Sequence, residues 1–395
     1  MTTLVIDTEN TIFQKGNPFS RRNKCVAVAL KKDDHPAICL KVEYDTPASS
    51  VILGRLSLEC GEADLVIGFN LKYDFHWLRR YGIQLHPHPK VFCTQLAQFI
   101  IENQQRRYPS LEDSCAYWGI TGKQNTIATD YWAKGIDNPD VPWEILRDRG
   151  ASDAELTYKL YLKQTEYLRA HPAMEKLVEL ANIDLLVLRE MEWNGLKFNT
   201  AKAKEREEQL NGEIQRIDES LRFHLGDYNF NFNSGDHLSC ILYGGTIVFR
   251  ERAPYLHRYK TGVKKGTTAM RSAIVEHEVT MPRLIAPIEG SELKKEGYFS
   301  TAAPVLAKLR PKQLAKRVID FLKRRAELEQ LVSTYYNGFP EKMLEMDWEP
   351  NEIHSQLNQC VAITGRLSSS GPNQQNIPPS VYELVETRYE NSMSK

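Results

Sequence analysis

Four acidic side chains in the first part of the chain could together hold a divalent cation. Asp7 and Glu9 stand two positions apart, directly after the apolar residues 4–6. In a β-strand, residues two apart point to the same side, so these carboxylates can converge on one point. Asp74 and Asp153 each stand where we expect a helix to open. Acids held close together are costly unless they are solvated or bind a cation, so a metal site is one interpretation of this set.

Each of these acids also has a purely structural explanation. A DxE pair occurs often by chance, and an acid in the first turn of a helix is stabilised by the helix dipole. Asn70 lies four residues before Asp74, and it would share a helical face with Asp74 if the helix has already begun there. Taken one at a time, these residues leave both interpretations open.

The elements that must position these side chains change in type along the chain. Apolar runs predict strands at residues 4–6, 27–30, 37–40 and 64–68. Helical spacing predicts helices around 73–81 and over 154–168, 174–193, 200–225 and 311–336. Residues 226–300 are expected to be rich in loops, and short strands are expected after Pro340. The order predicts an α/β region followed by a mainly helical one.

Composition narrows the class of protein. Hydrophobic residues make up 42% of the 395 positions, which is typical of a packed globular protein with two or three domains. The seven cysteines are scattered and form no CxxC pair, which argues against a disulfide framework and a zinc site and favours a reducing, cytoplasmic location. We expect no signal peptide and no membrane segment, since no apolar run approaches about 20 residues.

The charge is zero overall but unevenly distributed. Residues 250–325 contain 18 Lys and Arg against 7 Asp and Glu, a balance of +11 that leaves −11 for the rest of the chain. A basic block beside an acidic one suits a protein that binds phosphates in one region and metal ions in another. A solvated helical face is the other interpretation of the basic block.

The four acids lie in three short segments with recognisable neighbours. The segments are residues 7–9 (DTE), 68–75 (GFNLKYDF) and 150–157 (GASDAELT), and SLED at 110–113 is followed by YWGI at 117–120. In order and spacing they resemble the Exo I, Exo II and Exo III motifs of the DEDD exonuclease superfamily, in the version found in family A DNA polymerases.

This resemblance implies an RNase H-like fold and a 3′→5′ exonuclease. It assigns Asp7, Glu9, Asp74 and Asp153 as the catalytic carboxylates that bind two divalent ions, Mg²⁺ or Mn²⁺. Two such ions, roughly 4 Å apart, stabilise charge on the phosphate and generate hydroxide near neutral pH. Hard oxygen ligands suit these ions.

Arg149 departs from the family pattern. It stands where the polymerase branch carries the tyrosine that orients the attacking water, and Asp148 stands where another branch carries a histidine. A guanidinium has no acceptor atom and stays protonated, so Arg149 cannot take over the tyrosine role. It would contact the scissile phosphate instead, or the exonuclease is degenerate. Cys93 stands where relatives often carry an acid.

The last part of the chain carries the longest motif. Residues 364–378 read TGRLSSSGPNQQNIP, with His354 and Asn358 shortly before them. The string is very similar to the TGRLSS…PNxQNIP motif of family A DNA polymerases. The resemblance implies that Arg366, Asn373 and Gln375 contact the primer–template near the primer end, where minor-groove acceptors are common to every base pair.

Between these motifs, several segments resemble the thumb of family A polymerases. They are EWNGLKF at 192–198, NFNS at 231–234 and EGYFST at 296–301. The resemblance implies that the basic helix that follows contacts the backbone of duplex DNA without reading sequence. The residues expected to do so are Lys312, Lys316, Arg317, Lys323, Arg324 and Arg325.

The resemblance therefore implies three regions. Residues 1–172 would form the exonuclease domain, with a mixed sheet and flanking helices; 173–345 the mostly helical thumb; and 346–395 a truncated start of the polymerase palm. The family's polymerising carboxylates and fingers helix lie beyond these motifs. We therefore expect a second polypeptide that carries palm and fingers.

The expected function is part of a split, phage-type family A DNA polymerase that proofreads single-stranded 3′ ends and binds primer–template. Two alternatives remain open at this point. One is a DNA-binding subunit with a degenerate exonuclease, and the other is a stand-alone 3′→5′ nuclease.

Overall fold

The computed structural model describes residues 2–42, 47–86, 89–121 and 126–386, so the end of the expected palm segment (387–395) lies outside it. The chain forms two compact units. The first combines Met1–Thr200 with Phe339–Lys395, and the second is Ala201–Gly338. The second unit is thus inserted in the sequence of the first. The assignment of exonuclease, thumb and palm stays a prediction.

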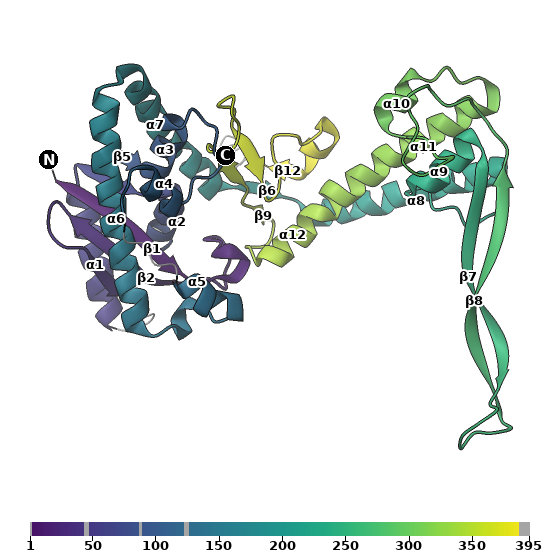
Figure 1. Cartoon of the computed structure of the whole chain (residues 1–395), viewed down its shortest axis with the longest axis horizontal. Coiled ribbons are helices and arrows are strands. Elements are labelled where there is room, and N and C mark those ends of the chain that lie inside the picture. The colour runs from purple at the N-terminus through teal and green to yellow at the C-terminus, as the bar shows by residue number, and fades with distance from the viewer. Residues whose placement is uncertain (1, 43–46, 87–88, 122–125, 387–395) are drawn as a thin grey trace, which may run out of the picture. The chain divides into compact units, whose positions relative to one another are not determined.

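A five-stranded mixed sheet forms the centre of the first unit (Figure 1). Its order is β3-β2-β1-β4-β5, with β1, β2 and β3 antiparallel and β4 and β5 parallel to β1. The strands are β1 (Thr3–Asn10), β2 (Cys25–Lys32), β3 (Ile38–Lys41), β4 (Leu65–Gly68) and β5 (Lys90–Cys93). The four expected strands and the mixed α/β character are confirmed, and β5 is an additional strand.

Helices cover both faces of this sheet, and the side chains of β1 alternate between the two faces. Leu4 and Ile6 belong to the core formed with α1 and α2, whereas Val5 packs in a cluster that contains Ala154 of α6. Because side chains alternate along a strand, Asp7 and Glu9 share the α6 side with Val5. The helices of this unit are α1 (Pro47–Glu62), α2 (Leu71–Arg80), α3 (Thr94–Ile101), α4 (Leu111–Tyr117), α5 (Thr126–Asp130), α6 (Trp143–Arg169), α7 (Pro172–Asn194) and α12 (Gly338–Met346).

Helix α6 differs from expectation at its start. It begins at Trp143, so Asp153 lies in its interior rather than at its opening. Stabilisation by the helix dipole therefore does not explain Asp153. The polar residues 147–150 (RDRG) hide the apolar periodicity of this first part of the helix.

The segment after the second unit returns to the first. Helix α12 spans Pro340 itself, and the short strands expected after Pro340 are present beyond this helix, in two small sheets. These are β12 (Val385–Glu386), β6 (Leu196–Phe198) and β9 (Glu352–Ile353) in one, and β10 (Gln356–Asn358) with β11 (Ser368–Ser370) in the other.

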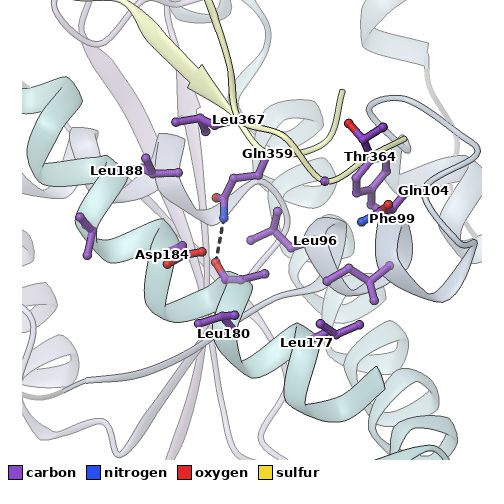
Figure 2. Close-up of a pocket in the computed structure, with 14 residues that line it drawn as sticks. Leu96, Phe99, Gln104, Leu177, Leu180, Asp184, Leu188, Gln359, Thr364 and Leu367 are labelled. Atoms are coloured by element: carbon purple, nitrogen blue, oxygen red, sulfur yellow. Dashed lines mark hydrogen bonds between the residues drawn. The ribbon is translucent and has the colours of Figure 1, made fainter. Parts of the chain in front are cut away.

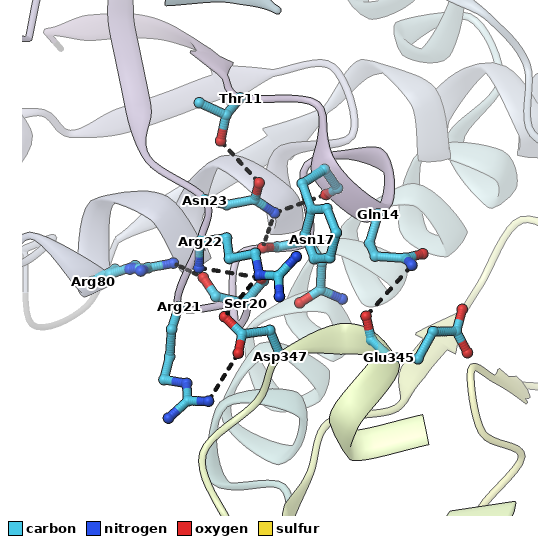
Figure 3. Close-up of polar contacts among 11 residues, drawn as sticks. Thr11, Gln14, Asn17, Ser20, Arg21, Arg22, Asn23, Arg80, Glu345 and Asp347 are labelled. Carbon is cyan, nitrogen blue, oxygen red and sulfur yellow. Dashed lines mark hydrogen bonds and ion pairs between the residues drawn. The ribbon is translucent and has the colours of Figure 1, made fainter. Parts of the chain in front are cut away.

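Polar contacts join this returning segment to the loop after β1 (Figure 3). Arg21 Nη2 lies 2.8 Å from Asp347 Oδ1, and the Arg21 N–H donates to the Asp347 carbonyl. Buried Asn23 organises the loop by donating to the carbonyls of Phe13 and Asn17 and accepting from Thr11. The loop thereby becomes a fixed docking surface for the segment around Asp347.

The second unit is built on helices and one long hairpin. Leu221, Ile241, Val318 and Leu328 are central members of its apolar core. Its elements are α8 (Thr200–Leu225), α9 (Gly235–Tyr243), β7 (Gly245–Arg258), β8 (Thr268–Met281), α10 (Ala303–Lys308), α11 (Gln313–Leu331) and a π-helical turn (Val332–Tyr336). Helices were expected over 200–225 and 311–336, and both are present.

The expectation of loops over 226–300 is wrong. Helix α9 and the antiparallel pair β7–β8 occupy much of that range, and each strand of the pair has 14 residues. Both faces of the pair are largely exposed, so the strands lack the alternation of apolar and polar residues that marks a half-buried strand. In the part of the chain that the structure describes, none of the helices is long and apolar enough to cross a membrane.

Candidate metal centre and nucleic-acid-binding residues

Three of the four predicted carboxylates converge at the end of β1. Asp7, Glu9 and Asp153 each place one oxygen within 4.8 Å of the others. Glu9 and Asp153 are buried, and Asp7 is partly exposed. The strand parity of Asp7 and Glu9 and the position of α6 over that side of the sheet produce this arrangement. Clustered hard oxygen donors of this kind suit a divalent ion such as Mg²⁺ or Mn²⁺.

Asp74 stands outside this trio but is tied to it through Thr8. Its Oδ1 accepts a hydrogen bond of 3.0 Å from the Thr8 N–H and one of 2.7 Å from the Thr8 hydroxyl. Thr8 lies between Asp7 and Glu9 on β1, on the opposite side of the strand. Buried Asp74 is therefore held beside the trio by α2, in the first turn of that helix.

The electrostatics of the cluster favour a cation. Although Asp7 is partly exposed, desolvation of its carboxyl group among its packed neighbours raises the pKa of Asp7 well above its usual value, and the charges of Glu9, Asp74 and Asp153 raise it further. Burial likewise raises the pKa of Asp74 to about 7, against the lowering effect of its hydrogen bonds from Thr8. A bound divalent ion would offset this repulsion and keep the carboxylates ionised near neutral pH.

A small residue lets α6 approach the sheet closely enough for Asp153 to join the cluster. A Cβ atom on Gly150 would lie 3.0 Å from Cys39 Sγ, 3.5 Å from the Ala29 Cβ and 3.7 Å from Glu9 Cγ. Ala154, one turn further on, is fully buried against the same side of the sheet. Larger side chains here would push the helix, and Asp153 with it, away from β1.

Arg149 lies directly against the acidic cluster. Its Nε is 3.8 Å from Glu9 Oε1 and 3.6 Å from Asp153 Oδ2. Its guanidinium carbon lies 4.5 Å from the centre of the Trp132 ring, and its Nη1 is buried without a hydrogen-bond partner among the described residues. The positive charge of Arg149 lowers the pKa of Asp7, in opposition to burial. Arg149 thus partly neutralises the site.

Asn70 does not share a helical face with Asp74. Helix α2 begins at Leu71, and exposed Asn70 precedes it with a left-handed φ of 56°. Asparagine tolerates this conformation better than most residues. Cys93 is buried, and burial raises the pKa of its thiol, so it is no substitute for an acid.

Sequence reasoning missed the buried network around Glu192. Its carboxylate accepts from Lys72 Nζ at 2.6 Å, from His76 Nε2 at 2.7 Å and from the Leu357 N–H at 2.5 Å. Lys72 Nζ also donates to the Leu357 carbonyl. Glu192 therefore joins α2, which carries Asp74, to the strand β10. Its place in the EWNGLKF segment was the only sequence signal.

The residues of the TGRLSS segment predicted to bind DNA are accessible. Arg366, Asn373 and Gln375 are all exposed. Gln375 is held locally, since its N–H donates to Asn373 Oδ1 and its Nε2 donates to the Leu367 carbonyl. Because Arg366, Asn373 and Gln375 are exposed, the Arg366 guanidinium and the solvent-facing amide atoms of Asn373 and Gln375 are accessible to a ligand.

A pocket of about 430 Å³ lies beside this segment (Figure 2). It is lined by α7 residues such as Leu177 and Leu180 and by Thr364 and Leu367, and Gln359 Nε2 spans to α7 by donating to the Ala181 carbonyl at 2.9 Å. Its lining is mainly apolar and contains no basic residue. It is therefore unsuited to phosphate.

The basic helix α11 divides into exposed and internally paired residues. Lys312, at its N-terminal boundary, and Lys316, Arg317 and Lys323 are exposed. Arg324 is exposed but lies 2.9 Å from Glu213 of α8.

Arg325 has a structural role instead of the expected contact with DNA. It is buried and pairs with Asp218 at 2.7 Å and Glu329 at 2.9 Å, and it donates to Asn233 Oδ1 at 2.6 Å. These contacts use its charge inside the unit, so we leave it out of the DNA-binding set.

Comparisons with known proteins match this chain to family A DNA polymerases and to DNA polymerase I sequences. A sequence profile of DNA polymerase family A matches residues 272–393. DNA polymerase I of Chloroflexus aurantiacus is 27% identical over 391 residues, which are 97% of this chain and 36% of that protein. DNA polymerase I of Bacillus subtilis is 26% identical over 304 residues, which are 76% of this chain and 28% of that protein.

The fold has a counterpart among solved structures. The POL domain of Pol1 from M. smegmatis, in complex with DNA primer–template and dNTP, superposes with a TM-score of 0.64 at 16% identity. The match covers 95% of this chain and 52% of that one. The chain spans about a third of the length of the Chloroflexus relative. Homology to family A, polymerase I-like DNA polymerases therefore extends across most of this chain.

Proposed function

We propose that the first unit is a metal-dependent 3′→5′ DNA exonuclease that proofreads for a family A DNA polymerase. The observation that carries this proposal is the convergence of Asp7, Glu9 and Asp153 within 4.8 Å, with Asp74 fixed beside them by Thr8. The strand order β3-β2-β1-β4-β5, with the first three strands antiparallel, supports the RNase H-like assignment.

The residues present fit a divalent metal site. The trio offers hard oxygen donors, and burial with mutual repulsion raises the pKa of Asp7, which a cation would relieve. Asp7, Glu9 and Asp153 would hold the metal, with Asp74 completing the site. Bound Mg²⁺ or Mn²⁺ would supply charge stabilisation at the phosphate and an acidified water. The chain itself orients the carboxylates through β1, α6 and the Thr8 hydrogen bonds.

We further propose that the chain binds primer–template DNA. Exposed Arg366, Asn373 and Gln375 provide donors for base edges. The exposed cations of α11 are proposed to contact the phosphate backbone, which carries no sequence information. The solved relative is a complex with primer–template, which supports this part of the proposal. The match covers 36% of the Chloroflexus enzyme, and primer extension, as an activity of a whole polymerase, is proposed to require palm and fingers as well.

One observation favours a second candidate function, a DNA-binding subunit with an inactive exonuclease. Arg149 Nε lies 3.6 Å from Asp153 and 3.8 Å from Glu9, so its charge competes with a metal for the same carboxylates. A metal ion that binds the trio must outcompete this guanidinium or displace it.

The test is digestion of a 5′-labelled single-stranded oligonucleotide with Mg²⁺ or Mn²⁺. The wild-type chain should produce a ladder that shortens from the 3′ end. The double variant Asp7→Ala with Glu9→Ala should lose this activity. The control Glu166→Gln, at an exposed acid near the far end of α6, should retain it. Equal digestion by the double variant and wild type would refute the site assignment. No digestion by wild type, with DNA binding retained, would establish the inactive alternative.

A further inference from the structure

The β7–β8 hairpin extends well beyond the core of the second unit. Its register runs from Gly245 opposite Met281 to Arg258 opposite Thr268. Ile247, Phe249 and Met281 anchor its base in the apolar core, while the residues beyond them are largely exposed. Figure 1 shows the two strands as an arm that runs away from α9 and α11 of the same unit. At about 3.4 Å per residue, 14 residues give an arm of roughly 45 Å.

The distal half of this arm is positively charged. Residues 256–272 contain five basic side chains and no acidic one: Arg258, Lys260, Lys264, Lys265 and Arg271. None of the five has a carboxylate partner in the described part of the chain, which includes the whole arm. The proximal half differs, because Arg250 pairs there with Glu276 at 2.8 Å. The unpaired charge is therefore concentrated at the end of the arm.

Aromatic rings accompany these cations on one face. Tyr255, His257 and Tyr259 follow one another at alternate positions, with ring centres 6.0 Å and 5.0 Å apart. The Arg271 guanidinium lies 5.1 Å from the Tyr259 ring centre, and its Nη2 donates to the Tyr259 hydroxyl at 3.3 Å. Cations with interleaved aromatic rings are typical of surfaces that bind nucleic acid.

We propose that the distal half of the β7–β8 arm is a DNA-binding element, separate from the residues assigned above. Its five uncompensated cations match the phosphate backbone, and a two-stranded ribbon fits the major groove, which is about 12 Å wide. An acidic protein would also satisfy the charge, but the rings that accompany the cations can in addition stack on the bases of a nucleic acid. Contacts to phosphate would hold DNA without reading sequence, which suits an element with few amide side chains.

The experiment measures DNA binding by the full chain in EDTA, so that no nuclease activity is required. Fluorescence anisotropy with a 30-base-pair duplex and with a matching single strand is recorded between 50 and 300 mM salt. The variant Lys260→Gln, Lys264→Gln, Lys265→Gln should bind duplex about tenfold more weakly, and the slope of log Kd against log salt should fall by up to about 3, since each phosphate contact contributes about 0.9. These side chains are exposed at the tip, so the melting temperature should not change.

The control replaces three exposed lysines of the first unit, Lys159→Gln, Lys163→Gln and Lys176→Gln, and should bind like wild type. An unchanged affinity and salt slope in the tip variant overturns the proposal. If the wild-type chain binds polyglutamate more tightly than duplex DNA, the proposal is also overturned, in favour of an acidic protein as the partner of the arm. A larger loss on the single strand than on the duplex would assign the arm to single-stranded DNA. Because DNA binding is measured without metal, its result does not depend on the outcome of the exonuclease test.

Discussion

The substitution Asp74→Asn should stabilise the metal-free protein while it removes exonuclease activity. Asp74 is buried, and its Oδ1 accepts both hydrogen bonds from Thr8. An asparagine oxygen can accept the same two bonds, so the local geometry is retained. The substitution removes only the charge, which in the absence of metal lies beside the negative charge of Glu9.

The magnitude follows from the pKa of Asp74, which burial raises from 3.8 to about 7. The folded state holds this proton more tightly than the unfolded chain, so the stability of the metal-free protein falls as the pH rises from about 4 to about 7. At about 1.4 kcal/mol for each factor of ten in proton affinity, the folded state carries a cost of about 4 kcal/mol at pH 8 and about 2 kcal/mol at pH 5. Asparagine carries neither cost, so these values are upper limits for the gain.

The assay is thermal unfolding in EDTA at pH 5 and pH 8, followed by the same scans with Mg²⁺. At about 2 °C per kcal/mol, Asp74→Asn should melt up to about 8 °C higher than wild type at pH 8, with a smaller gain at pH 5. Added Mg²⁺ should raise the melting temperature of wild type more than that of the variant. A variant that melts below wild type in EDTA at pH 8, or an exposed-site control such as Asp148→Asn with an equal gain, would refute the reasoning.

Two further predictions concern single residues near this site. Arg149→Tyr should raise the rate of 3′-end hydrolysis measured in the oligonucleotide assay, because a phenol can orient water and the competing positive charge is removed; a clear loss of rate would mean that Arg149 holds the phosphate. Glu192→Gln should destabilise the first unit by about 3 kcal/mol in denaturant unfolding at pH 7, because it breaks a charge pair whose acid is buried and leaves the partly buried Lys72 charge without its partner. Burial alone would raise the pKa of Glu192, but His76 and Lys72 hold it below 4.5, so the wild-type advantage is present above pH 4.5 and shrinks as the pH falls further; equal stabilities at pH 7 would contradict this.

The sequence was most informative where one short pattern determined the geometry. The two-residue spacing of Asp7 and Glu9 after an apolar strand predicted their convergence, and the structure has both carboxylates in one cluster. Asp153 was expected at a helix start and is found inside α6, because the polar residues 147–150 conceal the helical periodicity before it. Its membership of the cluster came from the family resemblance and not from local pattern.

Long-range and fully exposed features could not be predicted in this way. Glu192 meets Lys72 and Leu357, which are distant in sequence and carry no pattern that links them. The strands of the β7–β8 arm were not predicted, because exposure of both faces removes the alternation of apolar and polar residues that identifies a strand. The burial of Arg325 depends on Asp218 in another helix, and a run of basic residues alone gives no sign of such a partner.

The discontinuous first unit has a consequence for how the chain folds during synthesis. Strand β6 pairs with β9 and β12, and Glu192 accepts a hydrogen bond from the Leu357 N–H. These partners of β6 and Glu192 are synthesised only after the whole second unit. A ribosome moving at about 5–20 residues per second needs roughly 10–40 s to go from Phe198 to Glu386. Throughout that interval β6 has no strand partner and the buried carboxylate of Glu192 lacks its backbone donor. The second unit, whose sequence is continuous, can complete its fold first, and closure of the first unit then becomes the last step of folding.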